Sequence, residues 1–200
     1  GYLVPENTQT VNHGNAVRFL LSDFTTVENI DLETIHADLI AFNGGFTDGS
    51  HAYYIPNHAA LMARIDVNDW TSSGVETLDL SSILGQSNGG MQGNGFTAGG
   101  YGYICPYEHN YLIRIDLSDF TTSGVETVTL GCKGYFGAFT DGTYGYCVPQ
   151  YDSACTASST SDPQHGVLVR FTLDAASGSF GSATVLSTVD LAAADDDLQG

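Results

Sequence analysis

The chain has 200 residues, enough for one or two domains. Its 5 basic and 23 acidic residues give a net charge of −18, and so acidic a surface repels phosphate backbones and anionic lipid, which argues against nucleic-acid partners. The 42% of hydrophobic residues argue against disorder, and no apolar run is long enough to span a bilayer, so membrane insertion is not expected.

The first 43 residues predict three short strands. They read "GYLVP" (1–5), "AVRFLL" (16–21) and "VENIDL" (27–32), all rich in β-branched and aromatic residues. The same three kinds of strand recur downstream, where a further strand precedes them. The chain is therefore expected to begin inside a repeat, to end inside another, and to be a segment of a longer protein.

Three further repeats follow at 44–93, 94–136 and 137–200. Each opens with a variant of one motif, namely "GGFTDG" (44–49), "NGFTAG" (94–99) and "GAFTDG" (137–142). An aromatic strand ending in proline comes next, then a strand containing one arginine, and last a β-branched run such as "VETLDL". The Asp-Gly pair in the motif is typical of a tight hairpin turn, in which glycine supplies a positive φ.

One repeat of about 43–57 residues thus holds four short antiparallel strands. A single four-stranded sheet cannot bury both of its faces, whereas sheets stacked radially cover one another. The spacing and the strand count therefore predict an all-β protein, a β-propeller with four-stranded blades. Four repeats are visible, and the propeller is expected to be larger, with a closed four-bladed disc as the alternative.

Four of the five basic residues occupy one position of the repeat: Arg18, Arg64, Arg114 and Arg170. The favoured interpretation is a structural ion pair within each blade, since a charge between packed sheets needs a partner. The candidate partners are the motif aspartates Asp48 and Asp141. Repeat three has alanine at that place, so its arginine needs another carboxylate, such as that of Asp116. The alternative is a ring of cations that binds an acidic ligand.

A histidine precedes each of these arginines by a few residues: His13, His58, His109 and His165. Such positions on different blades lie too far apart to share one metal ion. The favoured interpretation is a hydrogen bond from each loop to neighbouring backbone, with titration near neutral pH as the alternative.

No motif of an enzyme is found, so the chain is predicted not to be one. Acidic pairs in the turns, Asp66 with Asp69 and Asp116 with Asp119, are weak candidates for Ca²⁺ ligands, as is the run 195–197. None matches a known calcium loop, and solvated turn carboxylates are the favoured interpretation. No cofactor is expected, with calcium as the only candidate.

The four cysteines, an even number, predict disulfides and an oxidising compartment. Four cysteines can pair in three ways, and the sequence does not choose among them. Cys132 and Cys155 fall in loops expected on the same face of the propeller, which suggests that they form one bridge. Cys105 and Cys147 would then form the other.

The tandem "FTDG…YGYxxP…R-x-D-L" units resemble a group of uncharacterised β-propeller-like repeat proteins of algae and other protists. The resemblance covers essentially the whole chain, and it departs at Ala98, Leu20 and Thr172, where aspartate is expected. It implies a propeller within large secreted or surface proteins, and it brings no catalytic residues.

These patterns predict a non-enzymatic module at the cell surface or outside the cell, serving adhesion or assembly. Its expected partners are other extracellular proteins or copies of itself. One alternative is a propeller that binds or hydrolyses glycans, because its strands are rich in tyrosine. Another is a unit of an extracellular filament or sheath.

Overall fold

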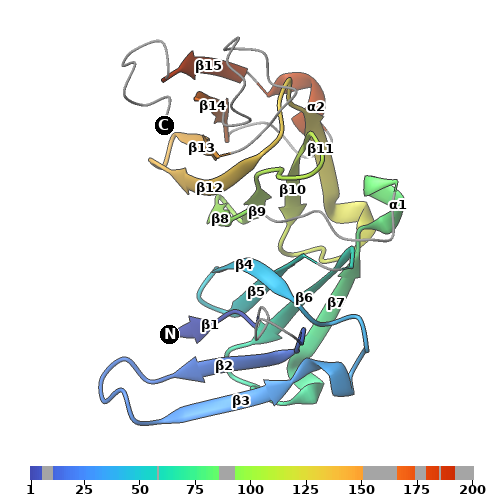
Figure 1. Ribbon diagram of the computed structural model, residues 1–200, viewed down its shortest axis with the longest axis vertical. Helices are drawn as coiled ribbons and strands as arrows, with labels where there is room; N and C mark the ends of the chain where they lie inside the picture. Colours follow the sequence, from blue (N-terminus) through green and yellow to red (C-terminus); the bar gives the residue numbers. More distant parts are fainter. Residues whose placement is uncertain are drawn as a thin grey trace. The chain divides into compact units, whose positions relative to one another are not determined.

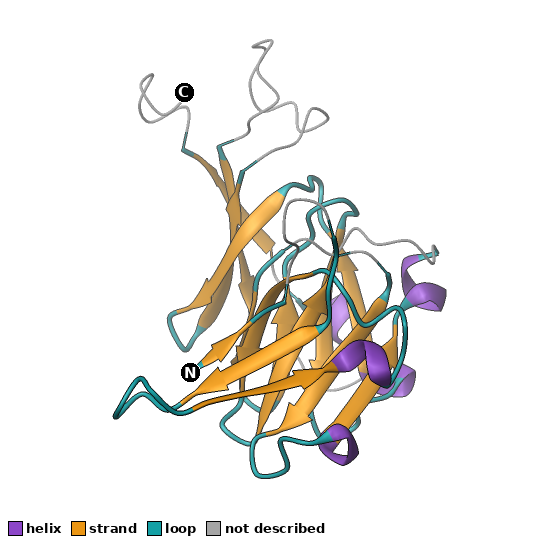
Figure 2. Cartoon of the chain, turned by 60° about the horizontal axis from the view of Figure 1, so that its bottom comes forward, coloured by secondary structure: helices purple, strands orange, loops and turns teal. Residues whose placement is uncertain are grey.

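The computed structural model describes residues 1–5, 11–57, 59–85, 93–150, 166–173, 179–184 and 186–191. The chain divides into two compact units, residues 1–92 and 93–200, and each is described by itself. Strands make up most of the described chain, with short helical turns between them (Figure 2). None of the helices in these ranges has the length and apolar character needed to cross a membrane.

The first unit contains two antiparallel sheets (Figure 1). Sheet 1 has three strands in the order β1-β2-β3, at Tyr2–Leu3, Asn15–Phe19 and Val27–Asp31. Sheet 2 has four strands in the order β4-β5-β6-β7, at Phe42–Thr47, His51–Pro56, Leu61–Asp66 and Val75–Asp79. The short helices η1 (Leu32–Thr34), η2 (Ser72–Gly74) and α1 (Ser81–Leu84) lie in the connections.

The second unit contains two more antiparallel sheets of four strands each. Sheet 3 has the order β8-β9-β10-β11, at Gly95–Ala98, Tyr101–Ile104, Tyr111–Asp116 and Val125–Thr129. Sheet 4 has the order β12-β13-β14-β15, at Tyr135–Thr140, Tyr144–Pro149, Val167–Thr172 and Leu186–Asp190. The helices η3 (Thr122–Gly124) and α2 (Phe180–Ala183) join the third and fourth strands.

These sheets confirm the predicted all-β class and the order of the four strands within each repeat. Sheet 1 lacks a first strand, as the opening "GYLVP" indicated. Strands β4 and β12 begin earlier than the repeat boundaries at 44 and 137, because Phe42 pairs with Pro56 and Tyr135 with Pro149 across a bulge.

The motif between the first two strands forms the expected hairpin turn. Gly49 and Gly142 have φ values of 91° and 90°, which favour glycine over residues that carry a Cβ. The aspartate before each glycine closes the turn by accepting backbone hydrogen bonds, at 2.7 Å from His51 N to Asp48 and 2.8 Å from Tyr144 N to Asp141.

Within each unit the two sheets share one apolar core. Alternate residues of sheet 2 pack against sheet 1, with Tyr54 and Ile65 facing Ala16 and Leu32. In the second unit the core includes Tyr103 and Leu112 of sheet 3 and Val169 and Phe171 of sheet 4. Face-to-face burial of this kind is what the repeat pattern predicted.

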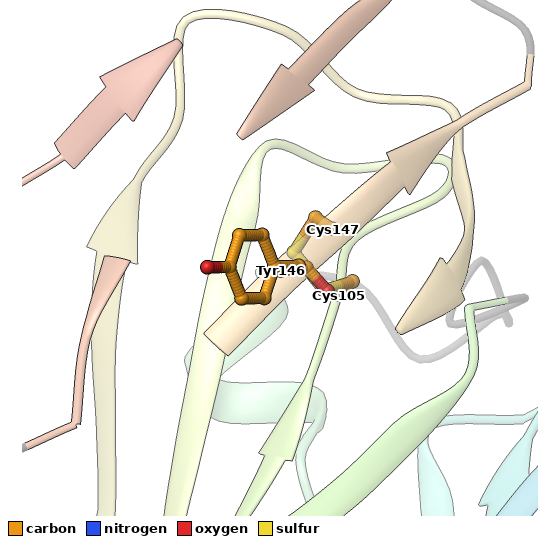
Figure 3. The surroundings of a disulfide bond; sticks show 3 residues. All are labelled: Cys105, Tyr146 and Cys147. Carbon is orange, nitrogen blue, oxygen red and sulfur yellow. A yellow bond between two sulfur atoms is a disulfide. The ribbon is translucent and has the colours of Figure 1, made fainter. Parts of the chain in front are cut away.

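A disulfide joins Cys105, which follows β9, to Cys147 on β13, with a Cα–Cα distance of 5.6 Å (Figure 3). It links sheets 3 and 4 and agrees with the predicted pairing. The other predicted bridge involves Cys155, which lies outside the described residues. A disulfide fits an oxidising compartment.

Candidate functional site: the arginine rows

The repeated arginine lies in a row of residues that stand opposite one another across the strands of its sheet. In sheet 2 the row is Phe46, Tyr53, Arg64 and Glu76. Sheet 3 has Phe96, Tyr103, Arg114 and Glu126, and sheet 4 has Phe139, Tyr146, Arg170 and Ser187. In the three-stranded sheet 1 the row is Tyr2, Arg18 and Glu28. We call this set the arginine row.

Glutamates on the last strand pair with three of the four arginines. Arg18 forms an ion pair with Glu28, and the Arg64 Nη2–Glu76 Oε2 distance is 2.8 Å. Arg114 donates from both Nε and Nη2 to Glu126 Oε2, the Nε bond measuring 3.1 Å. Each pair is adjacent because its two residues are cross-strand neighbours.

The expected pairing of arginine with Asp48 and Asp141 is therefore wrong. Asp48 lies beyond the end of β4, in the hairpin turn, and its Oδ2 accepts a hydrogen bond from the Tyr53 hydroxyl at 2.8 Å. Asp141 accepts one from Tyr146 at 2.7 Å. Asp116, the other suggested partner, accepts from the backbone and hydroxyl of Ser118 instead.

The hydrogen bonds of the hairpin turn keep Asp48 ionised. Burial alone would raise its pKa, but hydrogen bonds from the His51 backbone, from Ser50 and from the Tyr53 hydroxyl outweigh that effect. The result is a pKa lowered to about 2. The same kinds of hydrogen bond lower the pKa of Asp141.

The sequence carried a signal for the glutamates. Glu28, Glu76 and Glu126 all follow the valine of the "VEN" or "VET" run, ten or twelve residues after the arginine. On its own, that run predicts only a β-branched strand. Its repeated acid, opposite a repeated base on the adjacent strand, predicts a cross-strand ion pair.

The row also binds its sheet to the next one along the chain. In the first unit Arg18 Nη1 donates to the carbonyl oxygen of Val67 at 2.6 Å, and its guanidinium lies 5.0 Å from the centre of the Trp70 ring. Val67 and Trp70 belong to the link between the third and fourth strands of sheet 2. We call this segment of a sheet the c–d link.

The second unit repeats this arrangement. The guanidinium of Arg114 is 4.6 Å from the ring centre of Phe180, in the c–d link of sheet 4. The hydroxyl of Tyr103, in the same row, donates to the carbonyl oxygen of Leu173 at 3.1 Å. Leu173 follows β14 as Val67 follows β6. The contact between the two sheets, which we call a joint, therefore uses an equivalent carbonyl group in each unit.

Arg170 differs from the other three arginines. Ser187 replaces glutamate opposite it, and its side chain is exposed, whereas Arg114 is 0% exposed. The face of sheet 4 around it has a hollow of about 300 Å³, lined by Tyr146, Leu168, Arg170, Ser187, Thr188 and Val189. Tyr146 neighbours Cys147 (Figure 3), so its ring lies on the face opposite the disulfide.

Exposed large apolar side chains are confined to the repeats at the two ends of the described chain. They are Tyr2, Leu3, Val11, Leu20, Leu21, Phe24, Val27 and Ile35 in the first repeat, and Phe136, Phe139, Leu186 and Val189 in or beside sheet 4. The described residues of sheets 2 and 3 contribute none. The exposed large apolar side chains of the described residues thus gather on and beside sheets 1 and 4.

The loop histidines that the structure describes accept hydrogen bonds from backbone N–H groups. His13 Nδ1 accepts a hydrogen bond from Asn15 N at 3.3 Å, and His109 Nδ1 accepts one from Tyr111 N at 3.2 Å. Burial, helped by the charge of Lys133, lowers the pKa of His109 to about 4, which keeps the ring neutral. His58 and His165 lie outside the described residues.

The candidate calcium ligands belong to the c–d turns. Asp66 accepts from Asn68 N at 2.7 Å, and Asp69 accepts from the hydroxyls of Thr71 and Ser73. Asp119 makes the equivalent bonds in sheet 3, to Thr121 and Ser123. Among the residues that the structure describes, no three metal-ligating side chains come together. The run 195–197 lies outside them.

No family model and no curated protein matches the chain. Solved structures do. The chain is similar to virginiamycin B lyase from Staphylococcus aureus, at 12% identity and a TM-score of 0.56, over 88% of this chain and 48% of the lyase. It is also similar to regucalcin, a calcium-binding protein from Agrobacterium tumefaciens, at 12% identity and a TM-score of 0.54, over 82% and 54% of the two chains.

The chain has a β-propeller fold. Both of these proteins are propellers, and the sheets correspond to blades. The chain spans about half the length of each. At this identity the likeness shows the fold alone.

The prediction that the protein is not an enzyme is corrected by these comparisons. The similar structures include a lyase and the dihydro-heme d1 dehydrogenase NirN, which is 14% identical with a TM-score of 0.51 over 94% of this chain and 35% of the dehydrogenase. The same fold thus serves enzymes as well as binding proteins, and the lack of a familiar catalytic motif does not exclude an activity.

Proposed function

We propose that the protein is an interaction module that binds partner proteins through the uncovered faces of sheets 1 and 4. One observation carries this: all the exposed large apolar side chains of the described residues lie at these two ends. Apolar surface that gathers in patches, rather than being scattered, is typical of sites where another molecule binds. The described residues of sheets 2 and 3, which have the same repeat, leave none of the equivalent apolar side chains exposed.

The proposed setting is extracellular or at the cell surface, as part of an adhesive or scaffolding assembly. The disulfide between sheets 3 and 4 supports an oxidising compartment. The net charge of −18 supports protein partners over nucleic acid. Copies of the same chain are among these partners.

Sedimentation velocity over a range of protein concentrations tests this proposal. We expect the sedimentation coefficient of the 200-residue chain to rise with concentration. Val27→Asp in sheet 1 and Val189→Asp in sheet 4 place a charge on the two uncovered faces and should each weaken the association. Thr77→Asp, at an exposed residue of β7 in sheet 2, is the control. A chain that stays monomeric throughout would contradict the proposal.

A further inference from the structure

A hollow of about 400 Å³ lies in the second unit, where the hairpin turns of sheets 3 and 4 meet. The turn between β8 and β9 contributes to its lining, as do the turn between β12 and β13 and the end of β14. We call this space the turn hollow, and its lining includes Ala98, Gly99, Gly142, Thr143, Thr172 and Leu173. Because both sheets contribute residues, the turn hollow belongs to the joint between two consecutive repeats.

Two departures from the repeat meet in the turn hollow. The first strand of sheets 2 and 4 is followed by an aspartate, Asp48 or Asp141, and sheet 3 has Ala98 at that place. The third strand of sheets 2 and 3 ends in aspartate, and that of sheet 4 ends in Thr172. Both replacements line the same hollow, in a chain that has 23 acidic residues.

The stability of the turns does not explain these replacements. Asp48 closes its own turn by accepting hydrogen bonds from the backbone N–H groups of Ser50, at 2.8 Å, and His51. Asp66 and Asp116 each accept a backbone hydrogen bond in the c–d link, at 2.7 and 2.9 Å. Alanine has no side-chain acceptor for such N–H groups, and threonine is a weaker one than aspartate. The replacements therefore indicate a role of the hollow other than turn stability.

The alanine of sheet 3 also changes how one wall of the hollow is held. In sheets 2 and 4 the tyrosine of the arginine row donates its hydroxyl hydrogen bond to the aspartate of its own turn. Tyr103 has alanine in that turn, and it donates instead to the carbonyl oxygen of Leu173, at 3.1 Å. Leu173 lines the hollow, so this bond fixes the wall while the short side chain of Ala98 leaves room beside it. A wall fixed in advance lowers the entropy cost of binding a ligand.

The lining suits an uncharged ligand that has hydroxyl groups. Among the described residues that line the hollow, none has a carboxylate, an amine or a guanidinium, and Thr143 and Thr172 have hydroxyls that can donate and accept. Apart from adjacent residues, no atom lies within 4 Å of the place where a Cβ would stand on Gly99 or Gly142, so their peptide groups are accessible. The alanine and the leucine of the lining add an apolar contact.

The charges around the hollow disfavour a charged ligand. A cationic ligand would gain most from carboxylates at positions 98 and 172, where this joint lacks the aspartates of the repeat. An anionic ligand is repelled by the net charge of −18 and by the exposed Asp141, which is close to Thr143 in the same turn. Hydrogen bonds from the Tyr144 backbone and the Tyr146 hydroxyl lower the pKa of Asp141 and so keep it ionised.

We propose that the turn hollow binds one neutral sugar residue, either as a free sugar or at the end of a glycan chain. A pyranose ring has hydroxyl groups that donate and accept, together with an apolar C–H face, and the hollow offers a partner for each. Its volume lies within the range of about 300 to 1,000 Å³ that is common for small-ligand sites. None of the exposed apolar side chains on which the proposed function rests lines it, so this inference goes beyond that function.

A nuclear magnetic resonance titration tests the site. The methyl glycosides of glucose, galactose and mannose, added separately to the isotope-labelled chain, should shift the amide resonances of Gly99, Gly142 and Thr143. We expect at least one of them to bind with a dissociation constant on the order of 1 mM. Glucosamine, a cation, and glucuronate, an anion, should bind about tenfold more weakly. Tighter binding of either charged sugar than of all three glycosides would overturn the proposal.

Substitutions in the lining locate the ligand. Ala98→Leu fills the space beside Leu173 and should weaken binding at least about tenfold, whereas Ala98→Gly keeps the space and should bind within about twofold of the wild-type chain. Thr143→Ala removes one hydroxyl and should weaken binding by about three- to tenfold. Ser50→Ala makes the matched change at the equivalent place in the turn of sheet 2 and should leave the affinity unchanged. Circular dichroism checks that each variant is folded.

The outcomes separate this site from the proposed function. If none of the three glycosides shifts these amides at tens of millimolar, or if Ala98→Leu binds as the wild-type chain does, the sugar site is overturned and the interaction module is unaffected. An array of immobilised glycans that end in the best-bound sugar distinguishes the two sources. Retention on the array assigns a glycan chain, and binding of the free glycoside without retention assigns a free sugar.

Discussion

The carboxylate of Asp48 has a structural role in the hairpin turn instead of the ion pair with arginine that the repeat predicts. It closes a hairpin turn and accepts the hydroxyl hydrogen bond of Tyr53, a member of the arginine row. The aspartate thus supports the row through the tyrosine and not through the arginine.

Acid should weaken this contribution. The folded-state pKa of about 2 lies below the ordinary value of 3.8, so Asp48 stabilises the protein above pH 4 and loses that effect as the pH falls toward 2. Asp48→Asn should lower the unfolding free energy by about 1 kcal/mol at pH 7, since solvent screens part of the effect at this largely exposed turn. Urea titrations from pH 7 to pH 2 should show the two proteins converging. Asp38→Asn, at an exposed aspartate of the same unit, should change little.

His109 also makes the protein less stable in acid, over a higher pH range than Asp48. Its folded pKa of about 4 lies below the ordinary 6.5, so the neutral ring favours folding above pH 6.5, and the stability falls as the pH drops from 6.5 toward 4. The loss should reach about 2 to 3 kcal/mol by pH 4.5. His109→Gln should flatten this part of the profile in urea unfolding. An unchanged slope in that variant would argue against the buried neutral ring.

At the scale of the element, two arginines at the same position of the repeat have different surroundings. Comparing them shows whether the position in the repeat or the neighbouring sheet determines what the residue contributes. Arg114 and Arg170 occupy the same place on β10 and β14. Arg114→Ala leaves Glu126 without its partner beside a buried core and should cost about 3 to 5 kcal/mol. Arg170→Ala should cost less than about 1 kcal/mol in the monomer. Unfolding by guanidinium chloride at low protein concentration should be measured for both variants and compared.

The Cys105–Cys147 disulfide covalently links sheets 3 and 4 of the second unit. It closes a loop with a sequence separation of 42 residues, which limits the unfolded chain. Replacing Cys105 and Cys147 together by serine should lower the unfolding free energy by about 2 to 4 kcal/mol. Thermal unfolding of the double variant, with the other two cysteines kept, checks this. A melting temperature equal to that of the wild-type chain would contradict a stabilising role.

The strands were predictable because residues close in the sequence determine where each strand begins and ends. The motif glycines, the prolines that end each second strand and the β-branched runs mark where strands turn and stop. The partners of the arginines were predicted wrongly, since cross-strand register depends on how two strands align. The "VET" glutamates held that information, but only when read beside the arginine strand. The exposure of Phe24 and Arg170 was beyond sequence reasoning, because it depends on which sheets have neighbours.

At the scale of the whole molecule, the charge of −18 opposes the proposed assembly. Copies of the chain that associate still repel each other at longer range. Added salt screens that repulsion, with a screening length of about 10 Å at 0.1 M. Association should therefore strengthen from low to moderate sodium chloride concentration in sedimentation experiments. A steady weakening with salt would indicate that ion pairs, and not apolar and stacking contacts, dominate the interface.

In both described contacts between consecutive sheets, the earlier sheet supplies the arginine and the next sheet supplies the aromatic ring, and this direction has a consequence for how such a gene can grow. Because a sheet offers a guanidinium on one side and an aromatic link on the other, duplication of one whole repeat adds a matched pair of contacts and requires no new surface to evolve. Deletion of one repeat is equally harmless to the joints that remain. Descendants of this sequence can therefore change in length by copying alone, provided that the arginine and the ring are copied together.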